Sequence, residues 1–253
     1  MVGDGTYISQ TGGGSLTAGV LFGALGAIAN QASIAAESER VRKSVDAESV
    51  VRIVPAAQLA QAWEESALPE STDPKAVKVE PFVVFHLDND RTNVHVVPGL
   101  RASGSDLVVA NNKAPWTGHY LLPLERTLAP QKLHEPLDAA ELEEQRAAVR
   151  DAYAELLREL AKDLAGGVQV RKLASIKSAA LKATTIGFAG FTPGDIEQAP
   201  DGRLSIRVNV DNYGPAMTRA NPYFVFVFRS PKQYTFSLGP EDRTPARMNR
   251  PGF

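Results

Sequence analysis

The pattern of hydrophobic and polar positions gives its clearest hairpin signal in two neighbouring runs, residues 77–87 and 93–97. Both runs are rich in valine, the first also contains two phenylalanines, and the polar segment 88–91 separates them. Two such runs joined by turn-forming residues are typical of a β-hairpin. Further strands are predicted over residues 106–110 and 119–124, so the middle of the chain is expected to build an antiparallel sheet.

The last third of the chain predicts more strands. Residues 203–210 alternate strictly between polar and apolar, which indicates a strand with one buried face. Residues 223–229 are almost continuously apolar, so we expect a central strand that is buried on both faces rather than one that stacks nucleic-acid bases. Another strand is predicted over residues 234–238, whereas residues 170–183 form a basic amphipathic stretch.

Helical periodicity is strongest over residues 138–165. Apolar residues recur there at spacings of three, four and seven, which places them on one helix face. Asp138 and Glu141 have the spacing of a capping box, and a pair of glycines follows the helix. A shorter helix is predicted over residues 56–65, because Pro55 suits a first helical turn. The predicted fold class is therefore α+β, with an antiparallel β-sheet packed against a long α-helix.

The first 50 residues have an unusual pattern. Residues 5–36 contain no charged side chain, and the apolar run 18–29 is shorter than the roughly 20 residues that a bilayer-spanning helix needs. Small residues recur every four positions, at Gly19, Gly23 and Ala27, on one helical stripe that allows close backbone approach. We expect an N-terminal small-residue helical arm. We expect this arm to pack either on the protein's own core or on a partner. The partner would be another chain, such as a second copy of this one, or a membrane surface.

Composition and charge narrow the range of functions. The 253 residues have a net charge of -2, without the strong positive charge of a nucleic-acid-binding protein, so no nucleic-acid partner is expected. The absence of cysteine from these residues excludes disulfides, cysteine-zinc sites, iron–sulfur clusters and thiol nucleophiles within them. Charge is unevenly distributed, with a net of -8 over residues 1–165 and +6 over residues 166–253.

These patterns divide the chain into three segments. Residues 1–50 form the Gly-rich lead-in and the helical arm. Residues 51–165 form an α+β region with the hairpin and the long helix. Residues 166–253 form a basic, β-rich region, which is either a separate unit or part of the same domain.

Candidate chemistry is sparse. The sequence contains no phosphate-binding loop, dinucleotide-binding glycine motif, serine-hydrolase elbow or zinc-protease helix motif. His86 and His95 lie on opposite arms of the hairpin and become cross-strand neighbours if the turn is centred between them. With Asp88 and Asp90 nearby, they are candidate metal ligands. A turn one residue longer would separate the two histidines, so a structural role is the favoured alternative and no cofactor is expected.

The order of segments along residues 12–165 is distinctive. A Gly-rich, uncharged start leads to the apolar run 19–26 and the charged segment 37–42, and the hairpin turn brings Asp90-Arg-Thr92. Trp116-Thr-Gly-His-Tyr120 then precedes the long helix. In this order the chain resembles the uncharacterised periplasmic lipoproteins of Gram-negative bacteria. The resemblance implies an α+β domain, a signal peptide and lipidated cysteine ahead of Met1 in the native gene, and a periplasmic or outer-membrane-associated location. It implies no catalytic residues.

The leading interpretation is a non-enzymatic cell-envelope protein that binds a protein partner or an envelope surface. It depends on the small-residue arm, the missing catalytic motifs and the resemblance. Two alternatives stay open. One is an immunity-type inhibitor of a toxin enzyme, and the other is an envelope hydrolase or metal-dependent enzyme that uses the histidines and aspartates of the hairpin.

Overall fold

The structure is a computed structural model, which describes residues 5–10, 52–66, 68–73, 76–87, 92–108, 115–133, 135–165, 179–183, 188–192, 195–198, 203–209, 222–233 and 235–238. The expected N-terminal arm, with Gly19, Gly23 and Ala27, lies outside these residues. So do Asp88 and Asp90 of the hairpin turn.

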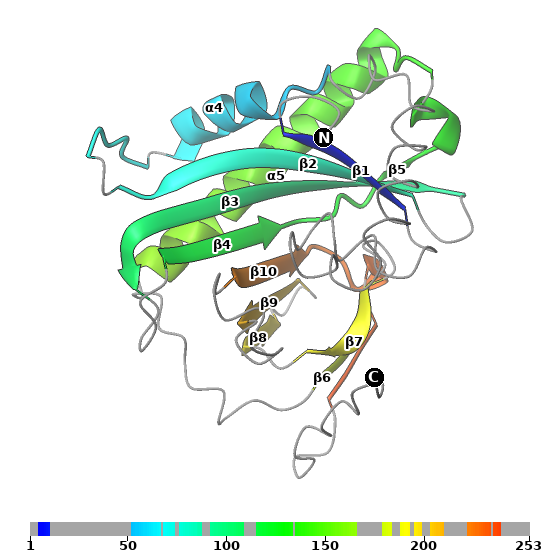
Figure 1. The fold of residues 1–253 in the computed structure, drawn as a ribbon. Helices are drawn as coiled ribbons and strands as arrows, with labels where there is room; N and C mark the ends of the chain where they lie inside the picture. Colours follow the sequence, from blue (N-terminus) through cyan, green and yellow to red (C-terminus); the bar gives the residue numbers. More distant parts are fainter. Residues whose placement is uncertain are drawn as a thin grey trace, which may run out of the picture.

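Eight strands form the main sheet. They are β1 (Thr6–Gln10), β2 (Lys78–Leu87), β3 (Val94–Val108), β4 (Pro115–Leu121), β5 (Thr127–Leu128), β8 (Asp195–Gln198), β9 (Leu204–Asn209) and β10 (Pro222–Phe228). Their order in the sheet is β1-β2-β3-β4-β10-β9-β8, and β5 pairs with β3. The helices α4 (Pro55–Ser66) and α5 (Ala139–Ala165) pack against one face of this sheet (Figure 1).

Smaller elements complete the described chain. Strands β6 (Ala179–Ala183), β7 (Phe188–Thr192) and β11 (Thr235–Leu238) form a second sheet in the order β11-β6-β7. Two short 3-10 helices cover Pro130–Leu133 and Pro231–Gln233.

The α+β class predicted from the sequence is confirmed, and the long helix packs on the sheet as expected. The sheet itself is mixed rather than wholly antiparallel, because β1 pairs with β2 and β10 with β4 in parallel. Parallel neighbours need a crossover connection. In both pairs a helix lies between the two strands along the chain, α4 in the first pair and α5 in the second.

The predicted hairpin is confirmed as the pair β2–β3. Its register runs from Lys78 opposite Ser103 to Leu87 opposite Val94, so it is centred on the polar segment between the two runs. Strand β3 continues to Val108 and includes the start of a strand that the sequence predicts as separate.

Strands β9 and β10 confirm two of the predictions for the last third of the chain. Strand β10 lies between β4 and β9 and is buried on both faces, with Phe224, Phe226 and Phe228 on one face and Val225 and Val227 on the other. The strand predicted over residues 234–238 is β11, which belongs to the second sheet. The sequence did not predict β1, β5, β6, β7 or β8, because runs of two to five residues contain too few positions to show a period.

Local signals set the starts of both helices. At α5, the Glu141 N–H donates to Asp138 Oδ1 at 2.8 Å, and the Asp138 N–H donates to Glu141 Oε2 at 3.2 Å. These two reciprocal bonds satisfy backbone donors that the first helical turn leaves unpaired. At α4, Pro55 occupies the first helical position, where its missing N–H costs nothing. Both predicted helices are therefore confirmed.

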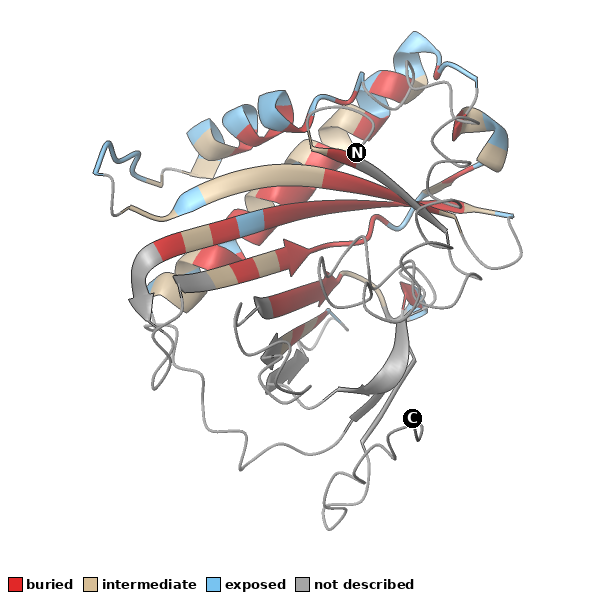
Figure 2. Cartoon of the chain, viewed as in Figure 1, coloured by how far each residue is buried: buried red, intermediate tan, exposed pale blue. Residues whose placement is uncertain are grey.

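The main sheet is buried on both faces over its centre. We call the face covered by α4 and α5 the first face; its core includes Phe85, Leu100, Tyr120 and Val225. The alternate positions form the second face. Its buried apolar side chains are Val84, Val97, Leu121, Leu204, Ile206, Phe224, Phe226 and Phe228. Figure 2 shows buried residues along β2, β3, β4 and β10 and exposed residues on the outer side of α4.

Candidate functional site

The structure brings His86 and His95 together. They lie directly opposite each other in the β2–β3 register, and their ring centroids are 6.3 Å apart. The turn is thus centred between them. This is the geometry in which the sequence makes the two histidines cross-strand neighbours. Both side chains are buried on the second face, where the next pair along the two strands is the apolar pair Val84 and Val97. This environment suits a core histidine as well as a metal ligand.

A metal centre would need more than this pair. The described residues contain no group of three or more His, Asp or Glu side chains that could hold a metal ion. Two imidazoles supply half of the ligands of a tetrahedral zinc site. The other two candidates, Asp88 and Asp90, lie outside the described residues. The hairpin therefore provides a two-histidine candidate site that needs further ligands from elsewhere.

A row of polar side chains crosses the second face away from the histidine pair. Glu80 on β2 lies opposite Arg101 on β3, and Arg101 lies opposite His119 on β4. Side chains that oppose each other directly are about 5 Å apart at Cβ. Lys78 precedes Glu80 on the same face, and its Nζ lies 2.6 Å from Glu80 Oε1. We call Lys78, Glu80, Arg101 and His119 the polar row.

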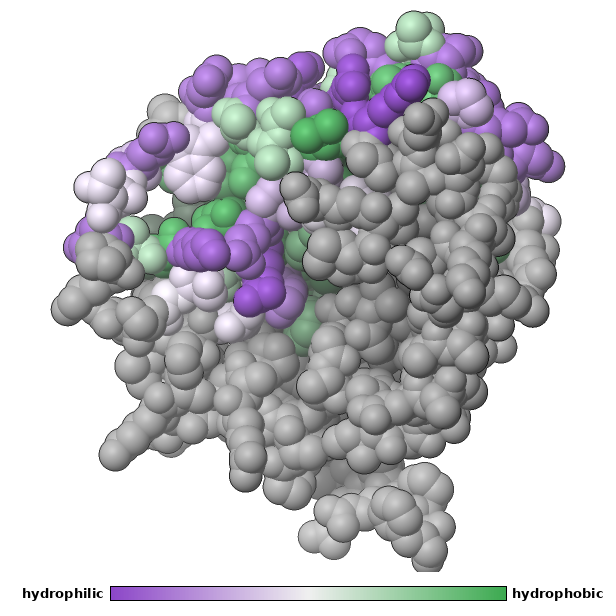
Figure 3. Space-filling view, turned by 45° about the horizontal axis from the view of Figure 1, so that its top comes forward, coloured by the Kyte–Doolittle hydropathy of each residue, from purple (hydrophilic) through white to green (hydrophobic). Residues whose placement is uncertain are grey.

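The charged members of the polar row are accessible. The side chain of Lys78 is 72% exposed and that of Arg101 is 55% exposed. The hydrogen bond from Lys78 lowers the pKa of Glu80, so this carboxylate stays ionised and paired at neutral pH. Figure 3 shows hydrophilic side chains along the upper rim and a second hydrophilic group nearer the middle of the view, with hydrophobic side chains between them. The exposed side chains of Lys78 and Arg101 are therefore available to a partner.

His119 is the half-buried member of the row. Its ring stacks on Phe224 of β10, with the centroids 5.0 Å apart and the planes at 18°. Burial, and after it the positive charge of Arg101, lowers the pKa of His119 from 6.5 to about 4, since both disfavour the imidazolium form. At pH 7 the imidazole is therefore neutral, with one nitrogen that donates a hydrogen bond and one that accepts.

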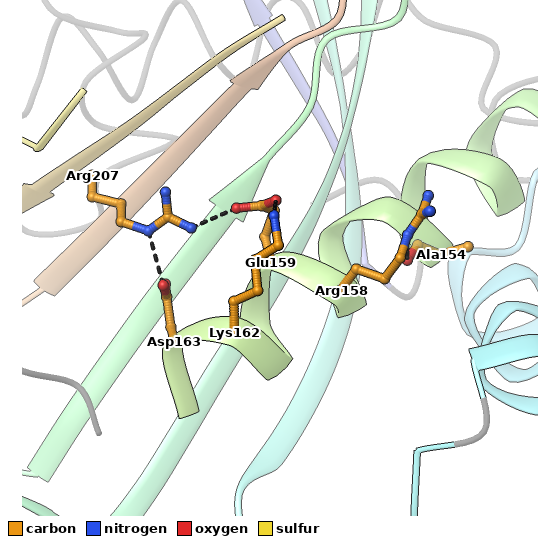
Figure 4. A network of polar contacts seen from close by, with 6 residues as sticks. All are labelled: Ala154, Arg158, Glu159, Lys162, Asp163 and Arg207. Carbon is orange, nitrogen blue, oxygen red and sulfur yellow. Dashed lines mark hydrogen bonds and ion pairs between the residues drawn. The ribbon is translucent and has the colours of Figure 1, made fainter. Parts of the chain in front are cut away.

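A second charged cluster joins α5 to β9 on the first face (Figure 4). Arg207 donates from Nε to Asp163 Oδ1 at 2.8 Å and from Nη2 to Glu159 Oε2 at 2.5 Å. Glu159 also accepts a hydrogen bond from Lys162, and Asp163 accepts one from the Tyr120 hydroxyl. We call Arg207, Glu159 and Asp163 the α5–β9 cluster. Their side chains are 15%, 10% and 9% exposed.

The α5–β9 cluster stabilises the fold. Burial alone would raise the pKa of Glu159, but the hydrogen bond from Lys162 and the charge of Arg207 outweigh it, so the pKa lies below its ordinary value. Arg229, which follows β10, pairs with Glu155 of α5 in the same way at 2.9 Å. These contacts join the basic last third of the chain to the acidic long helix. Because the charges satisfy one another inside the fold, we assign them to stability rather than to a binding site.

The sequence did not predict the polar row. The pairing of Glu80 with Arg101 follows from the hairpin register, so it could have been found by assuming the centred turn that would bring His86 and His95 together. The contact of His119 with Phe224 depends on the parallel pairing of β4 with β10, which are separated along the chain by the whole of α5. No local pattern specifies that pairing.

Comparison with family models, with curated proteins and with solved structures found no match for this chain. Within the described ranges, no helix is both long enough and apolar enough to cross a membrane. What the protein does is therefore inferred from its own residues and their geometry.

Proposed function

We propose that this chain is a non-enzymatic binding protein of the cell envelope, periplasmic or associated with the outer membrane, and that it recognises another protein through the polar row. The observation that supports this function most directly is the exposure of Lys78 and Arg101 on the second face. Unlike Arg207 and Arg229, these cations lie outside the ion pairs that join the strands to α5. The envelope location derives from the order of segments along the sequence.

A protein partner fits the polar row better than a lipid surface. Lys78 and Glu80 are a close pair, so the net charge of the row is the single positive charge of Arg101. One cation near an anionic bilayer contributes about 1 kcal/mol, and basic segments that bind such surfaces have roughly 4–8 Lys or Arg residues. An arginine beside an aromatic residue is, in contrast, a common composition for a protein interface.

Capture from envelope extract tests this function. We expect the immobilised full chain to retain a protein that the double variant Glu80→Ala/Arg101→Ala does not retain. The matched control is Arg126→Ala/Glu144→Ala, which removes another exposed ion pair and should retain the partner as the parent does. Equal retention by both double variants would contradict a role for the polar row. A toxin enzyme among the retained proteins would identify the function as immunity.

Vesicle sedimentation tests the competing surface. We expect the chain to stay in the supernatant with vesicles of anionic phospholipid and equally with vesicles of neutral phospholipid. Sedimentation with the anionic vesicles, combined with no retained protein, would replace the protein partner by a lipid surface.

The contact between His86 and His95 favours a second candidate, a metal-dependent envelope enzyme. Asp88 and Asp90 would then be the candidates for the remaining ligands. Metal analysis of protein purified without a histidine tag decides the matter. A stoichiometric metal that is lost in the His86→Ala variant supports this candidate, and metal-free parent protein excludes it.

A further inference from the structure

Arg101 has hydrogen-bonding capacity that the described fold leaves unused. Its one ion pair within the described ranges joins Nε to Glu80 Oε2 at 3.5 Å, the long end of the hydrogen-bond range. Glu80 is held more closely by Lys78, at 2.6 Å. The two terminal nitrogens of the guanidinium therefore make no ion pair to any described carboxylate, and the side chain that carries them is 55% exposed. A planar guanidinium in this state suits bidentate binding of an oxyanion.

His119 supplies a second polar group at the same place. It lies directly opposite Arg101 in the β3–β4 register, and Phe224 packs against one side of its ring. Within the described part of the chain, the ring nitrogens make no hydrogen bond. An N–H of the neutral imidazole can donate to an oxygen that already contacts the guanidinium. Arg101 and His119 thus present hydrogen-bond donors from two adjacent strands, beside an aromatic ring.

We propose that Arg101 and His119 form a binding site for a carboxylate side chain of the protein partner. This inference rests on the proposed function, because it names the chemical group by which the polar row recognises its partner. Lys78 and Glu80 form a neutral pair at the edge of the site. The partner's carboxylate would neutralise the one net positive charge of the row and bind the terminal nitrogens of Arg101.

Binding at this site should depend on pH. Among the residues that the structure describes, the charged and titratable groups near His119 are Arg101 on β3 and, beyond it, Glu80 on β2, while β10 contributes the uncharged Phe224. A bound carboxylate offsets the charge of Arg101 and favours the imidazolium, so it raises the pKa of His119. By linkage, the carboxylate binds more tightly as the pH falls through the raised pKa of His119, until the carboxylate itself takes up a proton at about pH 4.3.

NMR titration of the full chain with two short peptides tests the site. The probes are acetylated and amidated Gly-Glu-Gly and its matched control Gly-Gln-Gly, added at constant ionic strength. The imidazole signals of His119 are assigned with a His119→Asn variant. We expect the Glu peptide to shift these signals and to raise the titration midpoint from about 4, whereas the Gln peptide does neither.

Two variants separate the site from general screening. The Arg101→Gln variant should lose the response to the Glu peptide. Arg126→Gln removes an arginine that is similarly exposed but paired with Glu144, and it should keep the response. Equal responses to the Glu and Gln peptides, or an unchanged response in Arg101→Gln, would overturn the proposal. A response to inorganic phosphate without one to the Glu peptide would overturn the assignment to a carboxylate.

Failure of this inference is distinguishable from failure of the proposed function. If the Arg101→Gln variant still retains the envelope partner and the Glu peptide gives no response, the partner binds elsewhere on the chain. If the Glu peptide binds but the parent retains no envelope protein, the site exists and the proposed function is wrong.

Discussion

Removing the positive charge of the α5–β9 cluster should destabilise the fold strongly. The Arg207→Met variant keeps an aliphatic side chain but leaves Glu159 and Asp163 without their shared partner, at sites where their side chains are 10% and 9% exposed. Truncation of one partner in a buried ion pair costs about 3–5 kcal/mol, because the remaining charge has neither water nor a counter-charge. Arg207 retains some solvent contact, so we expect the free energy of unfolding to fall by about 3 kcal/mol, the lower end of that range.

The size of this loss should depend on pH in a defined direction. In the parent, the pKa of Glu159 lies below its unfolded value of 4.5. The carboxylate therefore contributes stability above that pH, and this stability is lost as the pH falls through the folded pKa. Without Arg207, burial acts on Glu159 with less opposition and the pKa is higher than in the parent. The difference between parent and variant should thus shrink as the pH falls through the raised pKa of Glu159 in the variant, and it should vanish below the lowered pKa of Glu159 in the parent.

Urea unfolding followed by far-UV circular dichroism, at neutral and acidic pH, measures both effects. The matched control is Lys162→Met, which removes a 60% exposed partner of the same Glu159. Because the Lys162 end of this pair is largely solvated and Arg207 remains in place, we expect the control to lose about 1 kcal/mol, less than Arg207→Met. Equal losses in the two variants would refute the reasoning. So would a loss in Arg207→Met that is the same at both pH values.

Three further substitutions test the packing and capping described above. Gly99→Ala would place a Cβ against the ring of Phe82, which covers this glycine on the neighbouring strand, so thermal unfolding should report a loss of about 1–3 kcal/mol. Tyr153→Phe removes a 2.9 Å hydrogen bond to the Phe82 carbonyl and should cost about 1 kcal/mol in urea unfolding; no loss would mean that water replaces the hydroxyl. Asp138→Ala removes the N-cap of α5 and should cost about 1 kcal/mol, whereas Asp138→Asn should restore most of it.

The sequence predicts local elements well and long-range pairing poorly. The capping box at Asp138 and the apolar period after it specify α5, because both signals lie within neighbouring turns. Turn residues and alternation likewise specify the hairpin, and its centred register places His86 opposite His95. Nothing in the alternation of β10 says that its neighbours are β4 and β9. That choice depends on which buried faces fit together after the chain has folded back.

Charge distribution along the sequence does contain part of the long-range information. An acidic segment of -8 precedes a basic one of +6, and such a difference favours contact between the two. Arg207 and Arg229 make that contact with the carboxylates of α5. The sequence alone could not show which charges meet, because the pairing of β9 and β10 determines where on the sheet these arginines lie.

The same pairing changes where a partner is expected to bind. From the sequence, the basic last third is the natural candidate for contact with an anionic surface. Two of its arginines, Arg207 and Arg229, are instead bound to α5. Arg101 belongs to the acidic part of the chain. Its terminal nitrogens nevertheless make no ion pair within the described part of the chain, and its side chain is exposed. The position of a charge relative to its neighbours, rather than the net charge of its segment, therefore identifies the group that is available for recognition.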